Sequence, residues 1–442
     1  MKQDNQTATH RARSSRTTPR KLKPDTSETV PPLPEAVTIA VSKLAGELEE
    51  GLLALAVGTG LQVLGAFMEA EVTELVGPKG QWNRERTAVR HGEDDGEVTL
   101  GGRRVPVRRP RVRTADRRAE VTLESYELFN TTDVLGRLAM ERMLAKLSTR
   151  RYHSGLEPVG EAVEARARGT SRSAVSRRFK AATETALAEL LAADLSDLDL
   201  VVLMVDGVHF AGHTCVVAMG IDAEGIKHPL ALEEGDTENA TLVKGLLAGL
   251  RDRGLDVTRP TLCVLDGAKA LHSAVKAVFD HPVIQRCQQH KIQNLKNKLP
   301  DAVASVAERE MRAAYRNPDS LAAQAALEQL ARRLGPQHPG AAASLREGLA
   351  ETLTIIRLGV PPTLARTLRS TNPIESMIEI CRDHCRNVKR WQDGQMVLRW
   401  CAAGMLEAKQ QFRRVNGHLH MKALRAALDE HIPVSEKKEV AA

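Results

Sequence analysis

The spacing of hydrophobic residues divides the first half of the chain into helical and extended stretches. Over residues 35–76, apolar positions such as Leu44 and Leu48 recur at helical spacing, which predicts helices. Residues 97–113 instead place valines and leucines between arginines, a pattern typical of extended chain. Helical spacing returns over residues 131–192. This half is therefore expected to be mainly helical around one extended segment.

The second half begins with a different pattern. Strand-like and helical runs alternate, with strands at 199–206, 214–221, 226–233, 261–266 and 282–286 and helices at about 238–253 and 268–279. This order predicts a mixed five-stranded sheet, because hairpins join antiparallel strands and helical crossovers join parallel ones. From Ile292 to about Arg366 the sequence is alanine-rich and helical, with a break at 335–340, and a last helix starts near Pro373. The expected fold class is α/β with an all-helical segment before that last helix.

Composition narrows the class of protein. Aromatic residues make up 3% of the 442 residues, so the core must be mainly aliphatic, and binding of single strands on stacked aromatics is disfavoured. Six cysteines in so long a chain do not make a disulfide scaffold. No run approaches 18 uncharged apolar residues, and the basic N-terminus has no apolar signal core, so no membrane span is expected. We expect a cytoplasmic, nucleoid-associated protein.

The net charge of +7 is modest, but the positive charge is clustered. Residues 1–33 are basic and predicted to be a disordered tail, which is compatible with non-specific phosphate binding. The densest positive stripe follows in the extended segment and consists of Arg103, Arg104, Arg108, Arg109, Arg111 and Arg113. Such a stripe predicts contacts with DNA phosphates. The alternative is the charged outer face of an edge strand that discourages aggregation.

A helix-turn-helix motif is predicted within residues 131–196. Its first helix would pass through 147–151, and its second would cover 172–180 after the turn Gly169-Thr170-Ser171. Ala174, Val175 and Phe179 would face the core. The residues expected to face outward into a major groove are Arg172, Ser173, Ser176 and Arg177. The alternative is an ordinary capped amphipathic helix with a basic solvent face.

Three acidic residues are candidates for one metal site. Asp206 ends the apolar run 200–205, and Asp266 ends the apolar run 262–265. Glu375 lies just inside the helix that starts near Pro373. Carboxylate oxygens are the ligands that hard cations prefer, and a pair of such ions can stabilise both oxygens of an in-line phosphoryl displacement. If the three side chains converge, the chain cuts or joins DNA.

Each of these acids also has a purely structural interpretation. Asp206 with Gly207 could form a hairpin turn, and Asp266 could cap a helix that begins at Ala268. Glu375 could belong to a capping box with Asn372 as the cap. Two observations favour the metal site. Isolated carboxylates after apolar strands are costly unless paired. Glu375 also lies on a polar stripe of its helix, one position after each residue of the apolar stripe of that helix. The other members of this polar stripe are Glu379, Arg382, Arg386 and Lys389.

Several motifs resemble those of the bacterial Mutator-type transposases, which carry an Asp-Asp-Glu triad. The matching stretches are Val205-Asp206-Gly207, Val264 to Ala270, Gln285 to Leu295, Ser370 to Ser376 and the segment 169–176, within a likeness that covers most of residues 95–415. The resemblance implies a ribonuclease H-like fold with an all-helical insertion, and Asp206, Asp266 and Glu375 as catalytic residues. The family's Cys-x-x-His pair falls on Cys287 and His290.

The sequence offers weaker evidence for other kinds of functional site. Cys287, His290, Cys381 and Cys385 have the ligand count of a structural zinc site, but the last two lie on an apolar stripe where buried thiols need no metal. His290 is expected to order the edge of the active site or contact DNA, and a capping or core histidine is the alternative. The chain has no phosphate-cradling glycine loop and no Gly-x-Ser-x-Gly motif.

These observations predict a DNA transposase that binds terminal inverted repeats and performs cleavage and strand transfer. It would use two Mg²⁺ ions, with Mn²⁺ as a substitute, bind double-stranded DNA, and act as a homodimer or larger assembly. Candidate phosphate contacts near the triad are Lys269, Arg382, Arg386 and Lys389. The alternatives are a structure-specific metal-dependent nuclease and a catalytically silent DNA-binding regulator. The predicted domains are 1–33, 34–130, 131–196, 197–291, 292–368, 369–415 and 416–442.

Overall fold

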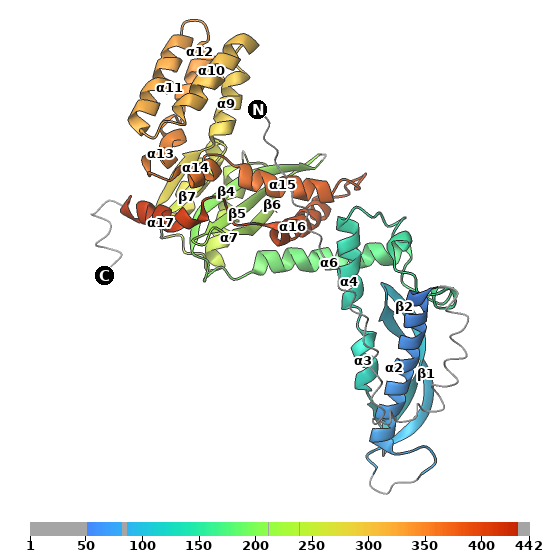
Figure 1. Cartoon of the computed structure of the whole chain (residues 1–442). Coiled ribbons are helices and arrows are strands. Elements are labelled where there is room, and N and C mark those ends of the chain that lie inside the picture. Colours follow the sequence, from blue (N-terminus) through green and yellow to red (C-terminus); the bar gives the residue numbers. More distant parts are fainter. Residues whose placement is uncertain (1–50, 82–85, 211, 238, 432–442) are drawn as a thin grey trace, which may run out of the picture.

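The computed structural model describes residues 51–81, 86–210, 212–237 and 239–431. Figure 1 shows three parts arranged along an extended molecule: an N-terminal unit, a central sheet flanked by helices, and a group of helices at the opposite end. The predicted tail over 1–33 and the predicted helix before residue 51 lie outside the described residues.

The N-terminal unit is a helix packed on a small sheet. Helix α2 (Leu52–Val76) lies against the antiparallel strands β1 (Ala88–Leu100), β2 (Arg103–Thr114) and β3 (Glu120–Val121). Helix α3 (Glu124–Asn130) follows. The core of the unit is aliphatic and includes Leu64, Met68, Val72, Val98, Val105 and Val112. The segment predicted as extended is therefore two strands of a hairpin that turns at Gly101-Gly102, both with positive φ.

Helix α2 is the only helix of the described residues that is long and apolar enough to cross a membrane. Residues 51–68 carry no charged side chain, a run that the sequence-based expectation of no such helix overlooked. In the structure, one side of α2 packs on the small sheet through residues such as Met68 and Val72. Phe67, on another side of the helix, is 59% exposed.

Short helices lead from this unit to the central sheet. They are α4 (Asp133–Leu144), η1 (His153–Gly155) and α5 (Glu161–Glu164), followed by the long helix α6 (Arg172–Ala192). The helix predicted through 147–151 is wrong. Lys146 adopts a left-handed conformation with φ of 71°, and the N–H of Leu147 bonds back to the carbonyl of Arg142 at 3.0 Å. This bond pattern ends α4.

The central sheet has five strands in the order β6-β5-β4-β7-β8. The strands are β4 (Leu200–Phe210), β5 (His213–Asp222), β6 (Lys227–Glu234), β7 (Thr261–Leu265) and β8 (Pro282–Arg286). The first three are antiparallel, whereas β4, β7 and β8 run parallel. The predicted mixed five-stranded sheet and its order of elements are confirmed.

Strand β4 continues further than its apolar run indicated. His209 and Phe210 pair with Thr214 and His213 of β5, and the His209 ring nitrogen lies 2.9 Å from the Thr214 hydroxyl. Asp206 therefore lies inside the strand, opposite Val217, and the prediction that it ends the strand is wrong.

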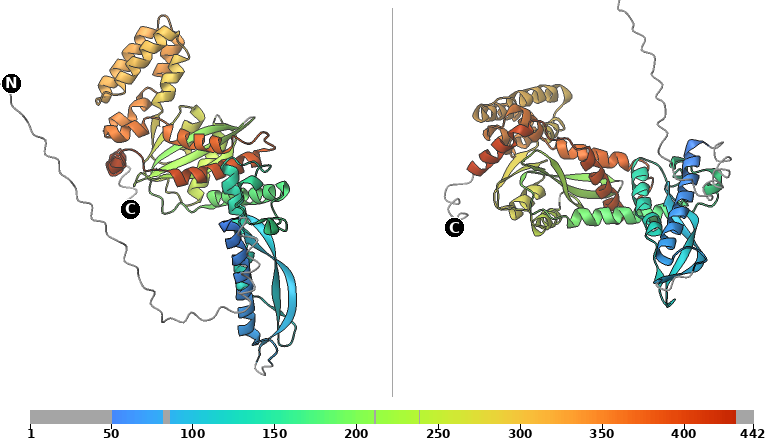
Figure 2. Two further views of the ribbon diagram at one scale, coloured as in Figure 1. Left: turned by 45° about the vertical axis from the view of Figure 1, so that its right-hand side comes forward. Right: turned by 60° about the horizontal axis from the view of Figure 1, so that its bottom comes forward.

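Helices cover both faces of the sheet (Figure 2). Helices α7 (Ala240–Asp252) and α8 (Lys269–Val278) share one core with Leu203 and Val205 of β4. The opposite core contains Val202, Met204 and Val208 together with residues of α6, α15 (Asn372–His384) and α16 (Gly394–Gln411). Because side chains alternate along a strand, Asp206 belongs to the face that α15 covers.

The segment between β8 and α15 is helical, as predicted. Its helices are α9 (Gln288–Lys296), α10 (Asp301–Ala314), α11 (Ser320–Leu334), α12 (Pro339–Arg346), η2 (Ala350–Leu353), α13 (Thr354–Arg357) and α14 (Pro362–Leu368). Residues from α9 to η2 form a separate hydrophobic core. The chain closes with η3 (His418–His420) and α17 (Met421–Glu430).

Candidate active site

The pairing of β4 with β7 brings Asp206 and Asp266 to the same level of the sheet. Met204 and Val264 are the last pair between β4 and β7, so each aspartate lies two residues beyond the end of this pairing. Parallel strands advance together at about 3.3 Å per residue, which keeps the two backbones side by side. Asp266 and Glu375 both help to raise the pKa of the Asp206 carboxyl, which places the three acids in one region of the molecule.

The structural interpretations of the two aspartates fit poorly. Asp206 and Gly207 lie within β4 and form no hairpin turn. Asp266 accepts the N–H of Ala268 at 2.8 Å, but α8 begins at Lys269 without a side-chain cap. The carboxylate thus steadies the turn after β7. Gly267 permits this turn with φ of 106°, where a Cβ would collide with the Arg286 guanidinium.

Glu375 is not part of a capping box. The N-cap of α15 is Thr371 rather than Asn372, and no side chain caps the helix. Instead, the Thr371 hydroxyl donates to Glu375 Oε1 at 2.5 Å. The same carboxylate oxygen lies 3.8 Å from His290 Nε2, and the Glu375 side chain is 41% exposed. The glutamate is therefore held in place while remaining open to a ligand.

The Cys-x-x-His pair forms a small network with Thr371. The buried Cys287 sulfur accepts the His290 backbone N–H at 3.5 Å and lies 3.4 Å from the Thr371 hydroxyl. That hydroxyl is also 3.4 Å from His290 Nδ1. The backbone N–H of Gln288 donates to the carbonyl of Arg369 at 2.9 Å, which fixes the start of α9 to the segment before α15. His290 thus lies at the edge of the acidic cluster, 3.8 Å from Glu375, and its role at an active site stays a prediction.

The titration behaviour of the site reflects burial and crowding of charge. Burial raises the pKa of the Asp206 carboxyl to about 6, and the neighbouring Asp266 and Glu375 contribute in the same direction. The pKa of His290 is raised to about 9, first by its hydrogen bond with Cys287 and then by Glu375 and Asp206. In the described part of the chain, Asp206 and Asp266 form no ion pair with lysine or arginine. The cluster therefore carries excess negative charge.

The side chains are not gathered around one point. Within the described ranges, no three histidine, cysteine or acidic side chains are close enough to hold a single ion together. The carboxylates instead form an open cluster contributed by β4, the end of β7 and the first turns of α15.

The arginine stripe mostly faces acids of its own unit. Arg103 is only 2% exposed, and its Nε lies 2.6 Å from Glu164 Oε2. Arg104 donates to the Asn130 carbonyl at 2.7 Å and to the Asn130 side chain at 2.6 Å. Acidic and polar partners of their own unit therefore occupy both guanidinium groups, and phosphate binding by these two arginines stays a prediction. Arg108 and Arg109 lie further along the hairpin beside Asp95 and Asp94.

The start of α6 matches the predicted second helix of the motif. The Ser171 side chain accepts the N–H of Ala174 at 3.3 Å, and Val175 and Phe179 are buried. The outward residues Arg172, Ser173, Ser176 and Arg177 are all exposed. The short helix before the turn is α5, not residues 147–151.

Other predicted residues lie further from the triad. Lys269 is exposed at the start of α8. Helix α15 ends at His384, so Arg386 and Lys389 do not share its face, and Arg386 pairs with Asp383 at 3.3 Å. Arg382 remains on α15, about 10 Å along the axis from Glu375 at 1.5 Å per residue.

The four proposed zinc ligands do not come together. The Cys381 sulfur donates to the Cys401 carbonyl at 3.8 Å, and Cys381 and Cys385 lie in the core between α15 and α16. Cys287 and His290 lie at the other end of α15, beside Thr371. Thr371 was not singled out from the sequence. The only available signal was its place in the Ser-Thr-Asn-Pro segment, which indicated a helix start.

Comparison with known proteins identifies the family. Residues 45–415 match the model of the family described as "Transposase, Mutator family". The chain is 26% identical over 370 residues to the transposase for insertion sequence element ISRM5 of Rhizobium meliloti (strain 1021), covering 82% of this chain and 90% of that protein. It is 33% identical over 197 residues to the transposase for IS6120 of Mycolicibacterium smegmatis, covering 43% and 60%. The chain therefore belongs to the Mutator family of transposases.

Proposed function

We propose that the chain cleaves DNA at the ends of an insertion sequence and joins those ends to target DNA, with Asp206, Asp266 and Glu375 as catalytic residues. The observation that carries this proposal is the open cluster of three carboxylates from β4, the end of β7 and the start of α15, in which no lysine or arginine of the described residues pairs with the two aspartates. The strand order β6-β5-β4-β7-β8 supports a ribonuclease H-like fold. The separate core over α9 to η2 supports a helical insertion before α15.

The residues fit a pair of hard divalent cations. The donors are carboxylate oxygens, and burial together with mutual repulsion makes their negative charge costly without a cation. Asp206, Asp266 and Glu375 would hold two Mg²⁺ ions, with Mn²⁺ as a substitute. When bound, such a pair stabilises the attacking and leaving oxygens of an in-line phosphoryl displacement.

The surrounding residues position the glutamate and bind DNA. Thr371 fixes the orientation of Glu375 by donating to it at 2.5 Å. His290 holds its positive charge beside Glu375 and Asp206, where it would meet a phosphate oxygen of the substrate. Lys269 and Arg382 are exposed on two helices that flank the cluster and would contact neighbouring phosphates. A homodimer or larger assembly is proposed because two element ends must be joined.

The activity test uses labelled duplexes that carry an element end. We expect the full chain to nick this DNA and transfer the strand only when Mg²⁺ or Mn²⁺ is added. Asp266→Asn and Glu375→Gln should each lower the cleavage rate by roughly 10²–10³-fold or more, because each removes a charged ligand. As the matched control, Glu379→Gln changes an exposed glutamate one turn along α15 and should keep the rate. Rates unaffected by both site changes would refute the triad.

Recognition of the element end is proposed to use the start of α6. Replacing both Arg172 and Arg177 by alanine should weaken binding to end DNA by roughly 30-fold or more, since each base contact is worth about 1–3 kcal/mol. Fluorescence anisotropy with end and unrelated duplexes measures this loss. Arg251→Ala, an exposed arginine paired with Asp252 on α7, is the control. If the loss of affinity for end DNA is no larger than that of Arg251→Ala, the start of α6 is an ordinary solvent-exposed helix surface.

Two other functions make different predictions in these assays. A structure-specific nuclease would cleave branched or flapped DNA with the same acids but would not transfer the strand. A silent regulator would bind the end duplex without metal-dependent cleavage. The relatives described as insertion sequence transposases favour strand transfer.

A further inference from the structure

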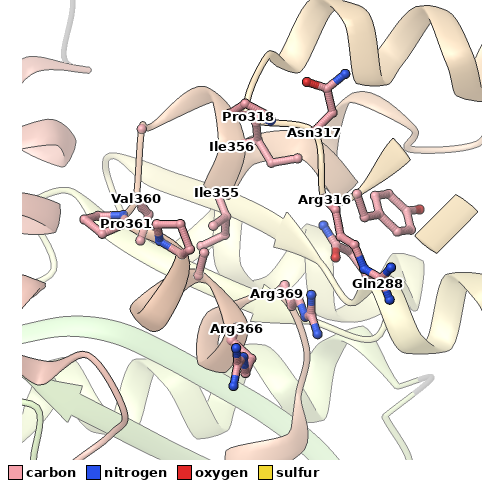
Figure 3. A pocket seen from close by; sticks show the side chains of 14 residues that line it. Gln288, Arg316, Asn317, Pro318, Ile355, Ile356, Val360, Pro361, Arg366 and Arg369 are labelled. Carbon is pink, nitrogen blue, oxygen red and sulfur yellow. The ribbon is translucent and has the colours of Figure 1, made fainter. Parts of the chain in front are cut away.

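A positively charged site lies beside the acidic cluster. A cavity of about 580 Å³ opens where α10, α13 and α14 meet the start of α9. Figure 3 shows Arg316, Arg366 and Arg369 lining it, with Gln288 next to Arg316. Ile355, Val360 and Pro361 provide an apolar wall. A small adjoining hollow adds Arg312 to the same lining.

These arginines form a cluster with a single acidic partner among the described residues. Arg316, Arg366 and Arg369 take part in no ion pair within the described ranges. Only Arg312 has a carboxylate, that of Glu308 at 2.8 Å. Burial lowers the pKa of the half-buried Arg369 guanidinium, and Arg366, Arg312 and Arg316 lower it further. Gathering four arginines with one acid between them is unfavourable unless an anion occupies the site.

The cavity is joined directly to the proposed active site. Arg369 precedes Ser370 and Thr371, and Thr371 donates to Glu375. The carbonyl of Arg369 accepts the N–H of Gln288, which follows Cys287 in the network around His290. The cavity and the acidic cluster therefore share the segments 287–290 and 369–371 as a common wall. A polyanion lying across that wall would contact both.

We propose that this arginine cluster binds the phosphodiester backbone of the DNA duplex that enters the active site. The inference rests on the proposed function, because it takes DNA as the substrate. Arginine suits this role, since its planar guanidinium binds phosphate oxygens through two parallel hydrogen bonds. The arginines lie on segments from both sides of the cavity. A bound DNA backbone would therefore contact both the helices that follow β8 and the segment that precedes α15. Contacts of this kind hold the duplex without reading its sequence.

The test compares two double variants of the full chain. Arg366→Ala with Arg369→Ala should weaken binding by roughly 10–100-fold, equally for end and unrelated duplexes, because backbone contacts are sequence-independent. The slope of log affinity against log salt should become shallower by about 2, since each phosphate contact contributes about 0.9. The control is Arg332→Ala with Arg333→Ala at the far end of α11, which should stay within about twofold. Fluorescence anisotropy in EDTA over several KCl concentrations measures both quantities.

Additional variants and a competitor distinguish the possible outcomes of this experiment. Arg366→Lys with Arg369→Lys keeps both charges and should preserve the salt slope, and thermal unfolding verifies that each variant folds. Unchanged affinity and salt slope in the double variant would overturn the assignment. So would equal competition by polyglutamate, because the site would then take any polyanion. If the native chain binds DNA through these arginines but never cleaves it, the proposed catalytic function fails and the binding site stands.

Discussion

Asp206→Asn should abolish DNA cleavage and, in the absence of divalent metal, make the protein more stable. The rate should fall by roughly 10³-fold, because the amide keeps the shape of the side chain but loses the charge that a cation requires. Stability should rise because Asp206 is a buried carboxylate near Asp266 and Glu375. Removing its charge relieves both desolvation and repulsion.

The pH dependence of this gain follows from the raised pKa of Asp206. The carboxyl titrates at about 6 in the folded chain and at an ordinary 3.8 when unfolded. Below pH 3.8 both states hold the proton, so the aspartate costs no stability. As pH rises to about 6 the unfolded state loses its proton first, and the cost grows to about 1–3 kcal/mol. Urea unfolding of wild type and Asp206→Asn in EDTA at pH 4 and pH 8 measures this difference.

A surface aspartate provides the control for the stability effect. Asp194 is exposed, and hydrogen bonds from Ser196 lower the pKa of its carboxyl. Asp194→Asn should therefore give no gain at pH 8. Adding Mg²⁺ should stabilise the wild type but not Asp206→Asn, since ligand binding to the folded state raises stability by mass action. An Asp206→Asn protein that is less stable than the wild type in EDTA would contradict the crowded-carboxylate description.

Trp400→Ala should cause the largest loss of stability among single core changes. Trp400 is 3% exposed and joins a chain of rings that runs through the core. Its centroid lies 4.5 Å from Phe179 of α6 and 6.4 Å from Trp391, which is 5.2 Å from Phe210 of β4. Truncating a buried aromatic to alanine costs about 3–5 kcal/mol. Denaturant unfolding should show this decrease in the free energy of unfolding.

Two variants make the stability measurement specific. Phe67→Ala removes an aromatic side chain that is 59% exposed on α2 and should cost well under half as much. Trp400→Phe keeps a ring against Phe179 and should retain most of the stability. Because the rings connect α6 with the strand that carries Asp206, Trp400→Ala should also reduce cleavage at temperatures where it remains folded. Equal losses for Trp400→Ala and Phe67→Ala would refute the role of this chain of rings.

The central sheet could be predicted from the sequence because its signal is local. Apolar runs indicated all five strands, and the structure pairs the strands that carry Asp206 and Asp266. The end of β4 was missed because His209 and Phe210 are not an apolar run, and their strand character comes from pairing with Thr214 and His213. Pairing partners of this kind are set by tertiary structure.

The errors at the polar sites have a similar origin. The acids of β1 lie across the hairpin from the arginines of β2, and Glu164 lies 61 residues after Arg103, so composition alone indicated a free positive stripe. The partners of Thr371 come from residues more than 80 positions earlier in the chain. The arginine cavity combines Arg316 with Arg366 and Arg369 from separate helices. None of these contacts leaves a periodic signal in the sequence.

Helix α6 is continuous and sets a fixed spacing within the molecule. Its first two turns carry the exposed Arg172 and Arg177, and further along Phe179 and Thr183 contact Trp400 and Arg399 of α16. Its 21 residues span about 30 Å, close to the length of nine base pairs of duplex. If the start of this helix reads the terminal repeat, the distance in base pairs between the recognised sequence and the cut bond is set by where along α6 the catalytic core packs, without reference to the sequence between them.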